Sequence, residues 1–212
     1  MERLLKGDDH ELVLAKLKEL GLLLLTDAKL PSVAGLVAGE PVRGSWWAHP
    51  DAHAIFGVGE TLSEHPDVTT AKLLAGKVTF VHRKLWPALV GVGAAKEPWQ
   101  LERLSEDARS FLQRVEREGA IRTDRVPSGR EGRRKSGEMA RQLEKSLLLH
   151  SEQIHTESGA HAKSLESWEH WMERVGLVGG RLEVKESKAR LEDAARAVGA
   201  ATKVFPRLPW RS

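Results

Sequence analysis

Residues 130–165 read REGRRKSGEMARQLEKSLLLHSEQIHTESGAHAKSL, and this stretch decides the fold that we predict. A basic segment leads into a helical pattern, SGEMARQLEKS, which is followed by an apolar run at 147–149. Two polar, strand-like segments, HSEQIHT and AHAKSL, then flank a turn at Glu157-Ser158-Gly159. A basic helix joined directly to a hairpin is typical of a recognition helix and its wing. The sequence therefore makes double-stranded DNA the first partner to test.

The predicted helix separates charged from apolar side chains. Its charged positions are four, three and four residues apart, so they fall on one face, opposite the apolar positions. The charged face comprises Arg134, Glu138, Arg141 and Lys145, and the apolar face comprises Met139, Leu143 and Leu147. Arginine reads guanine through paired hydrogen bonds, whereas lysine mostly meets phosphate. The alternative is a solvated face with internal ion pairs, such as Glu138 with Arg141.

The predicted wing adds further candidates around its turn. Histidine and lysine at such positions commonly reach phosphate or the minor groove. The alternative is that these side chains are simply the outward polar positions of a hairpin. The candidate DNA-binding residues of helix and wing together are Arg130, Arg133, Arg134, Lys135, Arg141, Lys145, His155, His161 and Lys163.

The distribution of charge along the chain agrees with DNA binding by the predicted helix. Residues 1–99 carry a net charge of −1 and residues 100–212 a net charge of +4, and residues 122–145 alone carry +4. Clustered positive charge is what phosphate binding requires.

The chain has no cysteine, no apolar run long enough to span a membrane and no signal-peptide pattern at its start. We therefore expect a cytoplasmic protein without membrane contact.

Two parts of the chain share a local signature. The segment GLLLLTD begins at Gly21 and is followed by Pro31-Ser32, and GAIRTD begins at Gly119 and is followed by Pro127-Ser128. Each time a helix, a glycine and a short strand lead to a Pro-Ser helix start, which indicates two units of one type. We predict an α+β, mainly helical fold of tandem winged helix-turn-helix units with short β-hairpin wings. The predicted units span residues 1–98 and 102–176, and a strand (RLEVKE) and a helix form an extension over residues 177–212.

The chain has seven tryptophans and no tyrosine, and two of them, Trp46 and Trp47, are adjacent. An aromatic pair can stack on an unpaired base, but packing in the core of a short domain is the interpretation that we favour for Trp46 and Trp47.

His49 and His53 have a spacing that can bind a metal on a helix, yet no third ligand is evident, so we expect no metal. Trp168 shares an apolar stripe with its helical neighbours and is expected in the core.

Familiar enzyme motifs are missing. The chain contains no Walker-type nucleotide loop, no GxSxG, no CxxC and no HExxH, and we expect no small-molecule cofactor.

A second phosphate contact is conceivable in the first predicted unit. Its hairpin is predicted from VTTAKLL and KVTFVH, which flank Ala75-Gly76, and Arg83 and Lys84 follow it directly.

Three segments nevertheless resemble a known family. RGSWWAHPDAHAIF, LLAGKVTFVHRKLWPAL and LLLHSEQIHTESGAHAKSLESWEHW are similar to segments of the bacterial AlkZ-related proteins, relatives of the AlkZ and YcaQ winged-helix DNA glycosylases. The resemblance covers most of residues 10–175 and implies tandem winged helices, DNA binding and, in the enzymes, excision of alkylated or crosslinked bases. Those enzymes carry a catalytic Gln-x-Gln motif, whereas no two glutamines here are two positions apart. We therefore assign no catalytic residue, although Glu152 and Glu157 are conceivable substitutes.

Three functions remain open from the sequence. The first is a DNA-binding protein resembling the glycosylases, which recognises or excises alkylated bases. The second is a non-catalytic winged-helix regulator or DNA-binding protein. The third is an interaction module whose helices bind protein.

Overall fold

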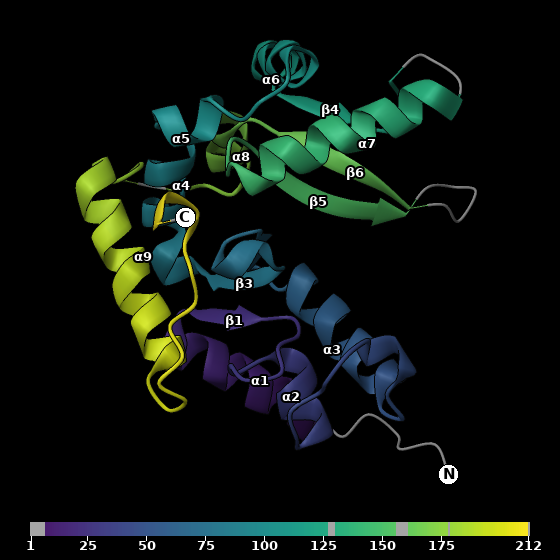
Figure 1. The fold of residues 1–212 in the computed structure, drawn as a ribbon, viewed down its shortest axis with the longest axis vertical. Coiled ribbons are helices and arrows are strands. Elements are labelled where there is room, and N and C mark those ends of the chain that lie inside the picture. The colour runs from purple at the N-terminus through teal and green to yellow at the C-terminus, as the bar shows by residue number, and fades with distance from the viewer. Residues whose placement is uncertain (1–6, 127–129, 156–160, 178, 212) are drawn as a thin grey trace. The chain divides into compact units, whose positions relative to one another are not determined.

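The computed structural model describes residues 7–126, 130–155, 161–177 and 179–211 (Figure 1). The fold is α+β, with helices predominating over two small antiparallel sheets. The chain divides into two compact units, one of Met1–Trp86 with Ala189–Ser212 and the other of Pro87–Lys188. Among the helices in the described ranges, none combines the length and the hydropathy that a membrane span requires.

The first unit begins with a helix that ends at a glycine. Gly21 adopts a positive φ of 80°, a conformation that glycine tolerates best, and the chain turns there into the first strand. The Ser32 side chain accepts a hydrogen bond from the Gly35 amide and so caps the second helix, as the Pro-Ser signature indicates. The elements are α1 (Gly7–Leu20), β1 (Leu22–Leu24), α2 (Val33–Ala38), α3 (Ala52–Glu64), β2 (Val68–Ala71) and β3 (Thr79–His82).

The first sheet places the first strand beside the last one. Its order is β1-β3-β2, and both pairings are antiparallel. Helices α1, α2 and α3 bury their apolar faces in one core with this sheet. The largest contributors to that core are Leu17, Leu23, Ile55, Leu62 and Phe80.

The second unit repeats the sheet. Its strands have the order β4-β6-β5, again antiparallel. Ser105 caps the helix before the first strand by accepting a hydrogen bond from the Ala108 amide. The elements are α4 (Trp86–Gly93), α5 (Pro98–Leu101), α6 (Glu106–Glu118), β4 (Ala120–Arg122), α7 (Arg130–Lys145), β5 (His150–His155), β6 (His161–Glu166) and α8 (Trp168–Arg174).

The two units differ in the segment before the hairpin. Two helices, α2 and α3, separate β1 from β2, whereas in the described residues α7 alone separates β4 from β5. The two consecutive helices that a helix-turn-helix unit predicts at this place are therefore absent from the described residues of the second unit. The predicted helix start at Pro127-Ser128 lies outside the described residues. Helix α7 already includes Arg130, so the basic segment is part of the helix itself.

The predicted edge strand in RLEVKE was also wrong. Val184 is the first residue of α9 (Val184–Gly199), and the Ser187 amide donates to the Glu183 carbonyl in its first turn. The helical spacing of Leu191, Ala195 and Val198 extends upstream, and this longer pattern decides the structure over the two-residue alternation of Leu182 and Val184.

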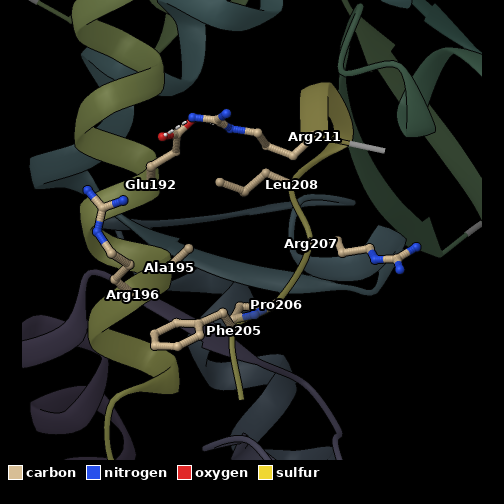
Figure 2. A pocket seen from close by; sticks show the side chains of 8 residues that line it. All are labelled: Glu192, Ala195, Arg196, Phe205, Pro206, Arg207, Leu208 and Arg211. Carbon is tan, nitrogen blue, oxygen red and sulfur yellow. Dashed lines mark hydrogen bonds and ion pairs between the residues drawn. The ribbon is translucent and has the colours of Figure 1, made fainter. Parts of the chain in front are cut away.

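The C-terminal tail packs within the first unit. The Arg207 carbonyl accepts a hydrogen bond from the Ala75 amide at 2.7 Å, and Leu208 is buried. Glu192 of α9 binds the tail, because its carboxylate accepts hydrogen bonds from the side chain of Arg211 (Figure 2). Trp210 Nε1 donates to the same carboxylate at 2.9 Å. A shallow groove of about 290 Å³ remains between α9 and the tail.

Candidate nucleic-acid interface

Helix α7 presents the predicted charged face to solvent. Arg134, Arg141 and Lys145 are exposed, and Glu138 lies exposed among them. The opposite face packs into the core of the second unit through Ala140 and Leu143, which are fully buried, and Met139 packs against that core. Leu147, predicted on the same face, is buried but follows the end of α7 at Lys145. The predicted amphipathic spacing is therefore confirmed, because the cations that the spacing groups together share the solvent side.

The remaining helix candidates are placed less completely. Lys135 is exposed beside Arg134. Arg130 and Arg133 belong to α7 by their backbone, but their side chains lie outside the described part of the chain. The same holds for His155 and His161, whose backbones are register partners at the turn end of the β5–β6 pairing. DNA contacts by these four side chains stay predictions.

Lys163 is engaged inside the protein. Its ammonium group pairs with the carboxylate of Glu144, a residue of α7 that is only 6% exposed. The Ser151 hydroxyl donates to the same carboxylate oxygen at 2.6 Å, so Glu144 connects α7 to both strands of the hairpin. Glu144 Oε2 has no partner among the described atoms. Lys163 thus points toward the helix rather than outward, and its side chain is one-third exposed.

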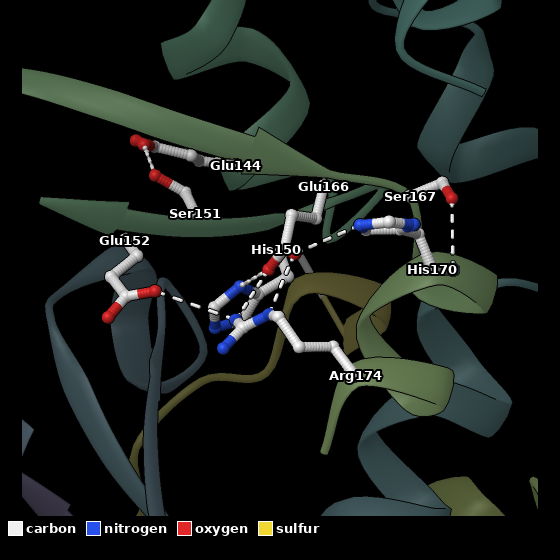
Figure 3. Close-up of polar contacts among 8 residues, drawn as sticks. All are labelled: Glu144, His150, Ser151, Glu152, Glu166, Ser167, His170 and Arg174. Carbon is white, nitrogen blue, oxygen red and sulfur yellow. Dashed lines mark hydrogen bonds and ion pairs between the residues drawn. The ribbon is translucent and has the colours of Figure 1, made fainter. Parts of the chain in front are cut away.

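The other face of the hairpin carries a buried ionic cluster that the sequence reasoning missed (Figure 3). Glu166 is 4% exposed and lies opposite His150 in the strand register. His150 Nδ1 lies 3.2 Å from Glu166 Oε2, and Arg174 of α8 donates to both carboxylate oxygens, at 2.8 and 2.6 Å. Burial alone would raise the pKa of Glu166, but the hydrogen bonds and charges of His150 and Arg174 lower it to about 2.

Aromatic rings enclose this cluster. His150 stacks on Trp171 with 5.1 Å between ring centroids, and Trp171 meets Trp168 edge to face. Trp168 Nε1 donates to the Leu147 carbonyl at 2.8 Å, and the side chain is 2% exposed, which confirms the predicted core position. A hairpin centred on Ser158 would pair His150 with Glu166, so the predicted turn already contained the signal for this pair.

In the first unit, the cations considered for a second phosphate contact are also engaged within the protein. Lys84 Nζ donates to the carbonyls of Lys18 and Glu19 at the end of α1, where a cation is favourable. Arg83 pairs with Asp67 at 3.5 Å and lies over the ring of Trp86.

The adjacent tryptophans have different environments. Trp46 is partly buried and packs against the core of the first unit, as favoured from the sequence. Trp47 is 63% exposed, so the core prediction was wrong for this ring. It stacks on Trp46 with centroids 4.0 Å apart and lies 5.6 Å from the exposed ring of Phe56 on α3.

The candidates for metal binding and for catalysis lie in different units of the structure. His49 lies 3.7 Å from both Glu40 and Asp51, and within the described ranges no group of three acidic, histidine or cysteine side chains is arranged to hold a metal. Glu152 is half exposed and lies 3.5 Å from Arg174. Glu157 falls outside the described residues. The comparisons with protein-family models, curated proteins and solved structures found no match for this chain.

Proposed function

We propose that the chain is a winged-helix protein that binds double-stranded DNA through α7 and the β5–β6 hairpin. In this proposal each unit is a winged helix, with α7 as a recognition helix and the hairpin as its wing. The order of the strands in each sheet, with the last strand between the other two, supports this assignment. A helix inserted into the major groove needs an outward face that carries hydrogen-bond donors and positive charge.

The observation that carries the proposal is the surface of α7. Three cations, Arg134, Arg141 and Lys145, share its exposed side, and the opposite side is fixed in the core. No described ion pair engages the side chains of these three residues, whereas the arginines of α6 at positions 114 and 117 pair with Glu118. Cations that are not neutralised by the protein release DNA counterions when they meet phosphate.

The resemblance to the AlkZ-related family adds recognition or excision of alkylated bases as a further hypothesis. Excision requires a group that orients water beside the sugar. Glu144 and Glu166 are buried and hydrogen-bonded within the protein, and Glu152 is half exposed beside Arg174. Binding without assigned catalysis is therefore the function that the geometry supports best. A single-turnover assay with duplex DNA that contains an N7-alkylated guanine tests the hypothesis of excision. Release of the base would show glycosylase activity in addition to DNA binding.

Duplex binding is tested by fluorescence anisotropy across a salt series. We expect Arg134→Ala/Arg141→Ala to weaken binding and to reduce the slope of log K against log salt by about 1 for each lost phosphate contact. The control is Arg181→Ala/Lys185→Ala, which removes the same charge from exposed positions outside α7. Equal effects of the two double variants, or no effect of the first, would remove α7 from the interface.

A further inference from the structure

The first unit has a surface at α3 whose chemistry differs from that of α7. No lysine or arginine occurs between Arg43 and Lys72, a segment that contains the whole of α3. On the exposed side of α3, Phe56, Glu60 and Glu64 follow one another at four-residue spacing and lie on one face. Trp47 adjoins this face through its contact with Phe56. We call these four residues the aromatic–acidic surface.

The aromatic part of this surface is held in position. Trp46 packs against the core and stacks on Trp47, so the Trp47 ring is supported by a side chain that is itself held by the core. A preordered side chain loses little conformational entropy when a ligand binds. Trp47 nevertheless remains mostly in water, and Phe56 is 37% exposed. An ordered tryptophan that is left exposed is typical of binding surfaces.

The charges around these rings select the ligand. An unpaired nucleic acid strand needs a basic groove beside the stacking rings, and here the neighbouring charges on α3 are carboxylates. Guanidinium and ammonium groups, in contrast, are attracted both by the face of an indole and by carboxylates. We propose that the aromatic–acidic surface binds an arginine- or lysine-bearing peptide segment of another protein. This inference is independent of DNA binding by α7.

The test is a titration of the full-length protein, followed by the indole N–H resonances in two-dimensional NMR. The probe is an octapeptide of alternating glycine and arginine, and its control has citrulline in place of arginine, which keeps the shape and removes the charge. A Trp47→Ala variant identifies the Trp47 resonance. We expect the arginine peptide to shift this resonance in a saturable manner and the citrulline peptide to leave it unchanged.

Variants separate this surface from binding of the peptide elsewhere on the protein. We expect Trp47→Ala and Glu60→Gln/Glu64→Gln each to weaken binding of the peptide by about three-fold or more, in line with exposed cation–π contacts. Phe205→Ala, which removes another exposed ring of the first unit, should leave the affinity unchanged. Thermal melts of all variants establish that they are folded.

Three outcomes would overturn the proposal. Equal shifts of the Trp47 resonance by the arginine and citrulline peptides would show that charge is not recognised. Tighter binding of single-stranded dT8 than of the arginine peptide, dependent on Trp47, would assign the surface to unpaired bases. Concentration-dependent self-association that Trp47→Ala abolishes would assign it to a second copy of the chain.

Discussion

Helices α3 and α7 precede equivalent hairpins, in sheets of the same strand order, yet their exposed faces are opposite in chemistry. The face of α7 carries arginine and lysine, whereas that of α3 carries phenylalanine and glutamate. The order of the strands is therefore repeated, but the positively charged helix surface that suits phosphate is not. The comparison teaches that topology identifies where a recognition helix would lie, and that the charge of its outward face decides whether DNA is a reasonable partner.

The tryptophans show the same division. In the second unit, Trp168 and Trp171 are buried around His150, and in the first unit Trp47 is left in water. Trp168 and Trp171 thus stabilise the interior of the second unit, whereas Trp47 forms part of the surface beside α3 in the first.

The largest expected effect concerns these tryptophans. Truncation of Trp168 to alanine leaves a cavity and an unpaired Leu147 carbonyl, so we expect a loss of about 3–5 kcal/mol in the free energy of unfolding of the second unit. Trp47→Ala should change stability by no more than about 0.5 kcal/mol. Hydrogen exchange monitored by mass spectrometry reads each unit separately. Comparable destabilisation by the two variants would contradict the assigned environments.

A smaller effect concerns acid stability. The pKa of Glu166 is about 2 in the folded protein, below its usual value of 4.5, so its contribution to stability is present above pH 4.5 and is lost as the pH falls toward 2. We expect this contribution to be on the order of 2 kcal/mol, since the partner Arg174 is partly exposed and screened.

The variant Glu166→Gln should flatten the pH dependence of unfolding of the second unit between pH 4.5 and 2. The control is Glu173→Gln, which alters an exposed carboxylate of α8, the helix that carries Arg174. An unchanged profile in Glu166→Gln, or equal flattening in the control, would mean that the cluster does not contribute as described.

The sequence predicted the α+β class and several individual elements because their signals are local. The glycine at position 21, the helix start at Ser32 and the spacing along α7 each act within a few residues, and all appear in the structure. The predicted turn implies the pairing of His150 with Glu166, but the ionic cluster was missed because Arg174 joins it through the docking of α8, which no local pattern encodes.

The candidate site was predicted in part for the same reason. Exposure of Arg134 and Arg141 follows from helical periodicity alone. The engagement of Lys163 does not, because it depends on a buried carboxylate supplied by a different element. From the sequence alone, a lysine in a hairpin is expected to point into solvent. The carboxylate that holds it can be identified only once the packing of the helix against the hairpin is known.

The smallest expected effect tests that engagement. Glu144→Gln removes the charge that holds Lys163, so the ammonium group becomes available to phosphate and the salt slope of DNA binding should become steeper by about 1. Ser151→Ala is the control, since it removes a hydrogen bond to Glu144 and leaves the ion pair. A slope that stays constant in Glu144→Gln, in a protein that remains folded, would show that Lys163 is not a reserve phosphate contact.

The most direct test of the contrast between α3 and α7 is a footprint of duplex DNA on the whole chain. Backbone amide resonances are recorded in two-dimensional NMR while a 12-base-pair duplex is added at low salt and then displaced at high salt. We predict salt-reversible shifts in α7 and in the β5–β6 hairpin, with α3 unaffected. Shifts that concentrate on α3 and leave α7 unchanged would contradict the assignment of DNA binding to the basic helix.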